Sequence, residues 1–310
     1  RHMFPPLVTG IVVLMIGFSL LKVGFMYAGG GGWLMSNKPE IFGNANHLFI
    51  AFTVLIVALI AHQKGKGMVS SASILIGIVA GYLVAMALGM VNYGKIADAG
   101  WFALPMPLQY GIDFVPGAII LMLFMSIVTT IETIGDISAT TMGGANREAT
   151  DKEISGGIMA DGAGTVFGAL FNAMPNTSYS QNAGLVAFTG VISRHVGTVA
   201  GVILILLGLF PKLGGIIAAM PDSVIGGAAI IMFGLIAGAG IKLISKSEMS
   251  QRNVLILALS LSFGIGLYAF PEFVAHVPDL GIKLGLLLTT GLIPAGLLAF
   301  ILNATLPNKK

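Results

Sequence analysis

Apolar runs of about the length of a bilayer crossing dominate the chain, and short segments with charged, glycine or proline residues separate them. A transmembrane α-helix needs about 20 mostly apolar residues. Charged residues make up 9% of the chain, whereas soluble domains carry about 25%. We therefore predict an all-α polytopic membrane protein with the lipid bilayer as its surroundings. The runs lie at residues 7–27, 46–62, 69–91, 114–134, 154–174, 195–210, 223–243, 253–270 and 285–305.

A polar segment that begins at Asn176 and ends at Arg194 interrupts this pattern. Six of its first seven residues are polar, and the apolar run that follows, 183–192, holds ten residues. Polar backbone at membrane depth is tolerated only where protein or a water-filled cavity covers it. We predict a short strand followed by half a helix whose positive N-terminus points into a binding site. The alternative is a re-entrant loop that only packs.

Two neighbouring amides, Gln181 and Asn182, lie at the centre of this polar segment. An amide side chain both donates and accepts hydrogen bonds, which suits a planar heterocycle with alternating N–H and C=O groups. Backbone groups of Tyr179 and Ser180, at the end of the predicted strand, would add further contacts. We expect these residues to bind such a ligand.

Two carboxylates, Glu132 and Asp136, lie at the end of the 114–134 run, with Thr133 between them. Their i,i+4 spacing places both on one helix face. Insertion of a charge into a membrane costs about 2.5–3.5 kcal/mol. Mutual repulsion and burial both favour a neutral form, so at least one carboxylate should bind a proton near neutral pH. That chemistry suits a proton-coupled carrier, while the alternative places both at a solvated helix end.

A third acidic residue, Asp161, lies early in the 154–174 run. It either accepts hydrogen bonds from the polar segment or is a charge at the end of a span. A channel would need a continuous polar stripe, whereas polar groups here gather at one depth. An enzyme is disfavoured because the chain has no cysteine and no Ser/His/Asp or His-Glu-x-x-His pattern. The histidines have no metal-ligating neighbours at helical spacing, so we expect them to be solvated.

The basic residues predict the orientation in the membrane. With 183–192 as a tenth crossing, both termini lie on one side, together with 11 of the 16 Lys and Arg residues. The positive-inside rule then makes both termini cytoplasmic. The thin spread of basic residues argues against nucleic acid as a partner.

An internal repeat relates residues 4–14 to residues 220–230 at an offset of 216, through identical Pro, Val and Gly residues. The two helices that they open are seven spans apart and therefore point in opposite directions. Inverted repeats are typical of secondary transporters. The spans from 114 to 210 precede the second copy, and their counterparts would precede the first. We expect the chain to lack four N-terminal spans of a longer parent.

The motifs of this chain resemble those of the nucleobase–ascorbate transporters, also called nucleobase:cation symporter type 2. The stretch Gln181–Arg194 resembles the family signature, Glu132–Asp136 resembles its second motif, and the gap from Asp161 to Gln181 also fits. The resemblance covers essentially the whole chain, as the last ten of fourteen spans arranged as seven plus seven. It implies gate-domain spans at 1–91 and 220–310, and core-domain spans at 112–212.

The resemblance also implies roles for individual residues. Glu132 and Gln181 would hydrogen-bond the base, with the backbone of Ser180, while Asp136, Asp161 and Asn182 would support the site or proton coupling. Uracil transporters of the family tend to have Glu and His at positions 181 and 136, so Gln and Asp resemble the xanthine and uric acid branch.

We therefore expect a symporter of the cytoplasmic membrane that imports xanthine or uric acid, with the proton as coupling ion and no other cofactor. The resemblance implies a homodimer. The alternatives are a uracil permease or an anion transporter of the same fold.

Overall fold

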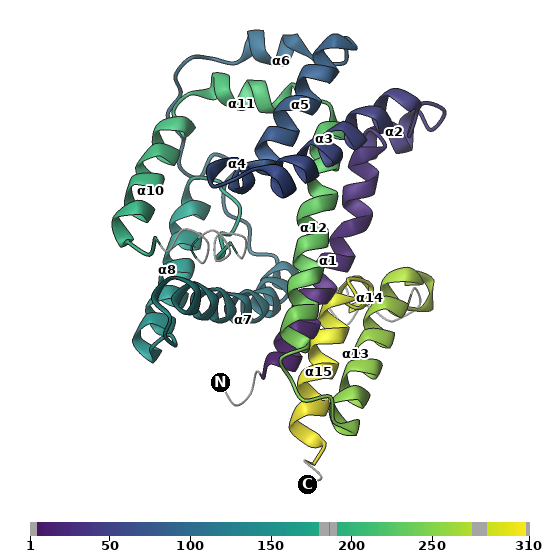
Figure 1. The fold of residues 1–310 in the computed structure, drawn as a ribbon, viewed down its shortest axis with the longest axis vertical. Coiled ribbons are helices and arrows are strands. Elements are labelled where there is room, and N and C mark those ends of the chain that lie inside the picture. The colour runs from purple at the N-terminus through teal and green to yellow at the C-terminus, as the bar shows by residue number, and fades with distance from the viewer. Residues whose placement is uncertain (1–4, 180–185, 187–190, 275–283, 308–310) are drawn as a thin grey trace. The chain divides into compact units, whose positions relative to one another are not determined.

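The computed structural model describes residues 5–179, 186, 191–274 and 284–307. Within these ranges all regular structure is helical (Figure 1), so the all-α prediction is confirmed for this part of the chain. The helices are α1 (Pro6–Ala28), α2 (Gly32–Asn37), α3 (Ala45–Lys64), α4 (Met68–Ser71), α5 (Ser73–Ala87), α6 (Tyr93–Asp98), α7 (Pro116–Ala145), α8 (Asp151–Leu170), α10 (Arg194–Gly208), α11 (Pro211–Ala218), α12 (Asp222–Ile244), α13 (Gln251–Ala269), the 3-10 helix η1 (Pro271–Val274), α14 (Leu284–Thr289) and α15 (Leu292–Thr305).

Every predicted span except 183–192 coincides with a helix or a pair of helices. Within the described residues, five helices are long and apolar enough to cross a membrane, namely α1, α3, α7, α12 and α13. The pair α10 and α11, bent by 81°, makes a possible sixth span. The region 183–192 lies mostly outside the described residues, so ten crossings stay a prediction. In the described part of the polar segment, residues 176–179 are non-helical and form no β-ladder.

Two of the predicted spans are broken into shorter helices. The run 69–91 forms α4 and α5, which meet at Ala72. The run 285–305 forms α14 and α15, and Gly291 between them has a φ of 68°. A positive φ is readily adopted by glycine, because it has no Cβ. Apolar composition alone carries no signal for such a break, and this is why the sequence predicts single spans there.

The chain divides into two compact units. The first comprises residues 1–19, 106–193 and 236–310, and the second comprises residues 20–105 and 194–235. The long helices α1 and α12 each contribute one half to either unit. The gate and core domains expected from the sequence stay a prediction about the complete transporter.

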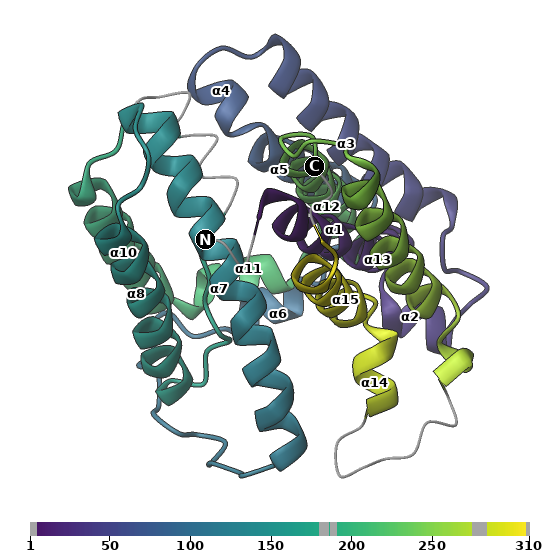
Figure 2. The ribbon, with the colours of Figure 1, turned by 90° about the horizontal axis from the view of Figure 1, so that it is seen from below.

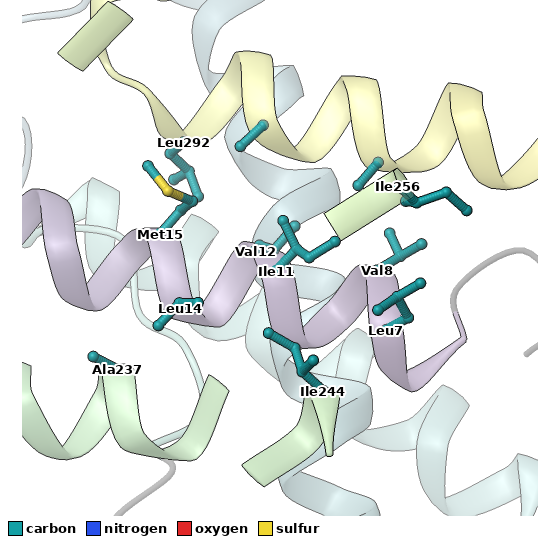
Figure 3. Close-up of a cluster of buried hydrophobic side chains, with 12 residues drawn as sticks. Leu7, Val8, Ile11, Val12, Leu14, Met15, Ala237, Ile244, Ile256 and Leu292 are labelled. Atoms are coloured by element: carbon teal, nitrogen blue, oxygen red, sulfur yellow. The ribbon is translucent and has the colours of Figure 1, made fainter. Parts of the chain in front are cut away.

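The core of the first unit forms where the first half of α1 packs against α13 and α15. All residues from Leu7 to Met15 of α1 are buried, because α13 and α15 pack on one side of this half of the helix and α12 packs on another. Figure 3 shows Val8 and Ile11 of α1 grouped with Ile256 of α13, and all three are 0% exposed. The other buried members include Leu7, Val12, Leu14, Met15, Ala237, Ile244, Leu292, Ala295 and Ala299.

The second unit has a corresponding core, in which the first half of α12 packs against α3 and α5. Val224 of α12 and Ile50 and Val54 of α3 are all 0% exposed. Helices α3 and α5 approach closely because Gly77 and Gly81 of α5 face α3 without a side chain. Small residues at such contacts allow helix backbones to come together in a membrane protein.

Helices α1 and α12 have the same length, 23 residues each, and they run antiparallel through glycine contacts. In the first unit Gly10 packs on Ile244, and Gly17 packs on Ala237. In the second unit Gly24 packs on Ile230. These three glycines are seven residues apart, or about two turns, so they lie on one face of α1.

The close approach of α1 and α12 predicts that the two helices do not tolerate an added methyl group. A Cβ at Gly240 would meet the backbone nitrogen and Cα of Leu14, which cannot rotate away. Overpacking costs about 1–3 kcal/mol, and the helix preference of alanine over glycine offsets about 1 kcal/mol of that. We expect Gly240→Ala to destabilise the detergent-solubilised full-length protein by up to about 2 kcal/mol, measured as a lower midpoint of thermal unfolding.

Gly238→Ala is the matched control, because a Cβ two residues earlier on the same helix has no neighbour within 4 Å. Its unfolding midpoint should stay the same or rise slightly. An equal drop in both variants would contradict the proposed contact.

Candidate functional site

The candidate site lies in the first unit, on the adjacent helices α7 and α8 (Figures 1 and 2). Helix α7 has 30 residues and continues to Ala145, well past Asp136. Glu132 and Asp136 therefore lie within the helix and not at its end. The apolar run stops at 134 because the residues that follow are small and polar. Their hydroxyls bond to the helix itself, as Thr141 does to the carbonyl of Ile137 at 2.8 Å.

The start of α8 is fixed by charge and by a capping box. Thr150 is the N-cap, and its side chain and that of Glu153 bond reciprocally to the backbone of the first turn. Arg147 binds both carboxylate oxygens of Glu153, at 2.8 Å and 2.6 Å. The hydrogen bond from Arg147, and those from Thr150, lower the pKa of Glu153. Because that pKa is depressed, the stabilisation is present above the ordinary pKa of a glutamate and is lost as the pH falls below it.

Asp161 joins α7, α8 and the polar segment through a single oxygen atom. Thr133 Oγ1 on α7 donates a hydrogen bond of 2.6 Å to Asp161 Oδ2, and Ser178 Oγ donates one of 3.2 Å to the same atom. Thr133 is 2% exposed, so its hydroxyl is shielded from water. Asp161 thus accepts a hydrogen bond from the polar segment, as the first of its two predicted roles requires.

Asp136 lies beside the polar segment as well. A cavity of about 390 Å³ is lined by Asp136, Thr140 and Thr141 of α7 and by Ser178 and Tyr179, among others. One carboxylate oxygen of Asp136 is buried, while the Tyr179 side chain is exposed. Glu132 is half-buried one turn before Asp136 on the same helix. An acidic group and the start of the polar segment thus meet at one cavity.

Three of the predicted site residues, Ser180, Gln181 and Asn182, lie outside the described residues. Their roles in ligand binding stay predictions. The structure brings together Thr133, Asp136, Asp161 and Tyr179 around the point at which these three residues begin.

Sequence reasoning missed Ser178, Thr165 and Asn176, which connect the polar segment to α8. The sequence contained one signal for this connection, because Asp161 and Thr165 are four residues apart and therefore share one helix face. It also expected His47 to be solvated, and this is wrong. His47, in the second unit, is 8% exposed, and its Nδ1 lies 3.4 Å from Ser223 Oγ.

Residues 1–273 match the Permease family. The chain is 35% identical to the xanthine permease XanP of Escherichia coli over 100% of the chain and 67% of that protein. It is 35% identical to the xanthine permease XanQ of the same organism, over 99% of the chain and 66% of that protein. It is 38% identical to the uric acid transporter UacT of Escherichia coli, over 97% of the chain and 61% of that protein. The chain thus spans about two thirds of the length of these curated relatives.

The hydrogen bond from Thr133 to Asp161 predicts that α7 and α8 depend on the Thr133 hydroxyl. Thr133→Val keeps the shape of the side chain and removes the donor. A hydrogen bond to a charged group contributes about 1.5–3 kcal/mol, so we expect a clear fall in the thermal unfolding midpoint of the full-length protein.

Thr129→Val, one turn earlier on α7, serves as the control, because among the described residues Thr129 Oγ1 bonds within its own helix, to the carbonyl of Ser126 at 3.1 Å. This variant should change the midpoint by much less. Equal midpoints for the two variants would contradict a structural role for the Thr133 hydroxyl.

Proposed function

Because the chain belongs to the Permease family, we propose that the protein is a secondary transporter that imports a purine base, xanthine or uric acid, together with protons. The observation that carries this proposal is the cavity at which Asp136 meets Ser178 and Tyr179. This cavity is open on one side, and its volume of about 390 Å³ is large enough for a small molecule. Permeases are transporters, and we assign no enzymatic activity to this one.

The substrate class rests on the residues that follow Tyr179 and on the relatives. Gln181 presents an amide two residues after Tyr179, and an amide can pair with adjacent N–H and C=O groups of a planar base. Glu132 would accept from a ring N–H, with backbone contacts from Ser180 and support from Asn182. The relatives named xanthine permease and uric acid transporter make these two purines the best candidates.

Proton coupling is proposed for the carboxylates of α7. Glu132 and Asp136 are four residues apart on one helix in the membrane, where two adjacent negative charges are costly. Asp161 is already engaged by two hydroxyl donors, so we assign it to supporting the site. Binding of a proton at Glu132 would reduce the repulsion and would change how this group can hydrogen-bond the base.

An inverted repeat is proposed for the gate domain. Helices α1 and α12 begin at Pro6 and Asp222, have equal lengths and match at the offset of 216 found in the sequence. In the first unit α1 packs on α13 and α15, and in the second α12 packs on α3 and α5. Each long helix therefore packs on helices of the other proposed repeat, which supports a two-fold relation. We also propose that both termini are cytoplasmic and that the protein forms a homodimer.

Uptake competition tests the substrate class. Cells that express the full-length protein should accumulate labelled xanthine or uric acid, and either unlabelled purine should compete, whereas excess uracil should not. A protonophore should abolish accumulation, since symport depends on the proton gradient. Accumulation of uracil with exclusion of both purines would favour the uracil alternative. Purine uptake that only equilibrates across the membrane would favour a channel.

Glu132→Gln tests the proposed coupling site, because glutamine keeps the size of the side chain and cannot release a proton. We expect accumulation of the purine to fall by about a hundredfold, the lower end of the range for loss of an acid–base group. Measurements of initial uptake across a range of external pH should show the loss.

The exposed loop variant Glu40→Gln is the control and should behave like the wild type. Unaltered pH-dependent accumulation in Glu132→Gln would remove this residue from the mechanism.

A further inference from the structure

Two residues that the proposed site does not use connect the polar segment to α8. Thr165 Oγ1 donates a hydrogen bond of 2.8 Å to the side-chain oxygen of Asn176. It also accepts one of 3.2 Å from the backbone N–H of Asn176. A single hydroxyl thus holds both the side chain and the main chain of Asn176.

Gly164, the neighbour of Thr165 on α8, leaves the space that the Asn176 side chain occupies. A Cβ at Gly164 would lie 2.9 Å from Nδ2 and 3.2 Å from Oδ1 of Asn176. Real Cβ atoms are rarely found so close to another group, so a larger residue would displace the amide. The surface of α8 is therefore shaped to receive Asn176.

A second connection of the same kind lies one helical turn earlier. Asp161 accepts from Ser178, as Thr165 bonds with Asn176. Ser178 follows Asn176 in the segment, but its partner Asp161 precedes Thr165 on the helix. The segment therefore runs antiparallel to α8. The reversal follows Phe171 at Asn172, whose φ of 62° is left-handed.

The spacing of these two connections fits an extended chain. Four residues of an α-helix rise about 6.0 Å, and two residues of a strand rise about 6.6 Å. Alternate residues of an extended segment therefore meet residues four apart on a helix. Asn176 and Ser178 face α8 in this register, and Thr177 and Tyr179 alternate away from it.

We infer that Thr165 and Asn176 are a positioning pair that sets the register of the substrate-binding segment. With Asp161 alone, the segment could pivot about one contact at Ser178. A second contact two residues earlier fixes its direction and so places Tyr179 at the cavity. A slip by one residue would turn the opposite set of side chains toward α8. This inference rests on the proposed function, because the segment it positions is the one that we propose binds the base.

Transport kinetics of the full-length protein test the pair. Thr165→Val removes the hydroxyl and keeps the shape, and we expect the KM for the transported purine to rise on the order of tenfold, as for the loss of one or two hydrogen bonds. Thr165→Ser keeps the hydroxyl and should restore the wild-type KM. Thr198→Val on α10 is the matched control, because in the described part of the chain Thr198 Oγ1 bonds to the carbonyl of Arg194 in its own helix.

A double-variant cycle separates positioning from general damage. Asn176→Leu should raise the KM by a similar factor, and the double variant with Thr165→Val should raise it by less than the product of the two, because both changes remove one connection. A KM unchanged in Thr165→Val, or factors that multiply, would overturn the inference.

A labelling experiment gives a readout that does not depend on transport. The chain has no cysteine, so Tyr179→Cys introduces a single thiol into it at the cavity. We expect Thr165→Val to change the alkylation rate at position 179 severalfold, while Thr198→Val leaves it unchanged. A shifted rate would uphold the positioning pair even if the protein that retains Tyr179 transports neither purine, and that second result would reject the proposed substrate. An unshifted rate would reject the pair.

Discussion

The close contact between α1 and α12 is the interaction on which much of this structure depends. Within a membrane, apolar side chains gain little from leaving lipid for a neighbouring helix, so association relies on packing and on hydrogen bonds. The glycines at positions 10, 17 and 240 let the two backbones approach in the first unit, and Gly226 does so beside Ala28 in the second. Each core is then completed by the two helices that pack beside this pair.

A different interaction organises the polar region of α7 and α8. Thr133, Asp161 and Ser178 share one carboxylate oxygen, and Thr165 holds Asn176 one turn along α8. These bonds satisfy polar groups that would be costly to expose to lipid. They also bring Ser178 and Tyr179, at the start of the polar segment, to Asp136, which lies more than forty residues earlier in the sequence.

The sequence predicted the positions of the helices well, because apolar runs of bilayer length have few other solutions. It placed the end of α7 too early, since helix formation continues through small and hydroxyl-bearing residues such as Ser138 and Thr141 that lower the apolar signal. The break at Gly291 and the burial of His47 also escaped it. Gly291 lies against Gly264 and Tyr268, and His47 lies beside Ser223, so both features involve residues distant in the sequence.

The candidate site was also predicted only in part, because it depends on contacts between segments that are distant in the sequence. The i,i+4 spacing identified Glu132 and Asp136, and it could have identified Asp161 and Thr165 had the polar segment been aligned antiparallel to α8. Pairing between a helix and an extended segment has no local sequence signature. The side-chain pattern of each segment is the same whether or not the other segment packs against it. The structure was needed to show that Asn176 and Ser178 are the residues that face the helix.

The two connections to α8 also bear on how this stretch of chain can change in length during evolution. The turn between Leu170 and Asn176 joins two fixed points and can absorb an inserted or deleted residue as a loop does. Between Asn176 and Ser178 the spacing of the segment is set by α8. The rise of four helical residues, about 6.0 Å, matches that of two extended residues, about 6.6 Å, and one extra residue in the segment would break this match. Insertions and deletions among related proteins should therefore accumulate before Asn176 and be absent between it and Ser178.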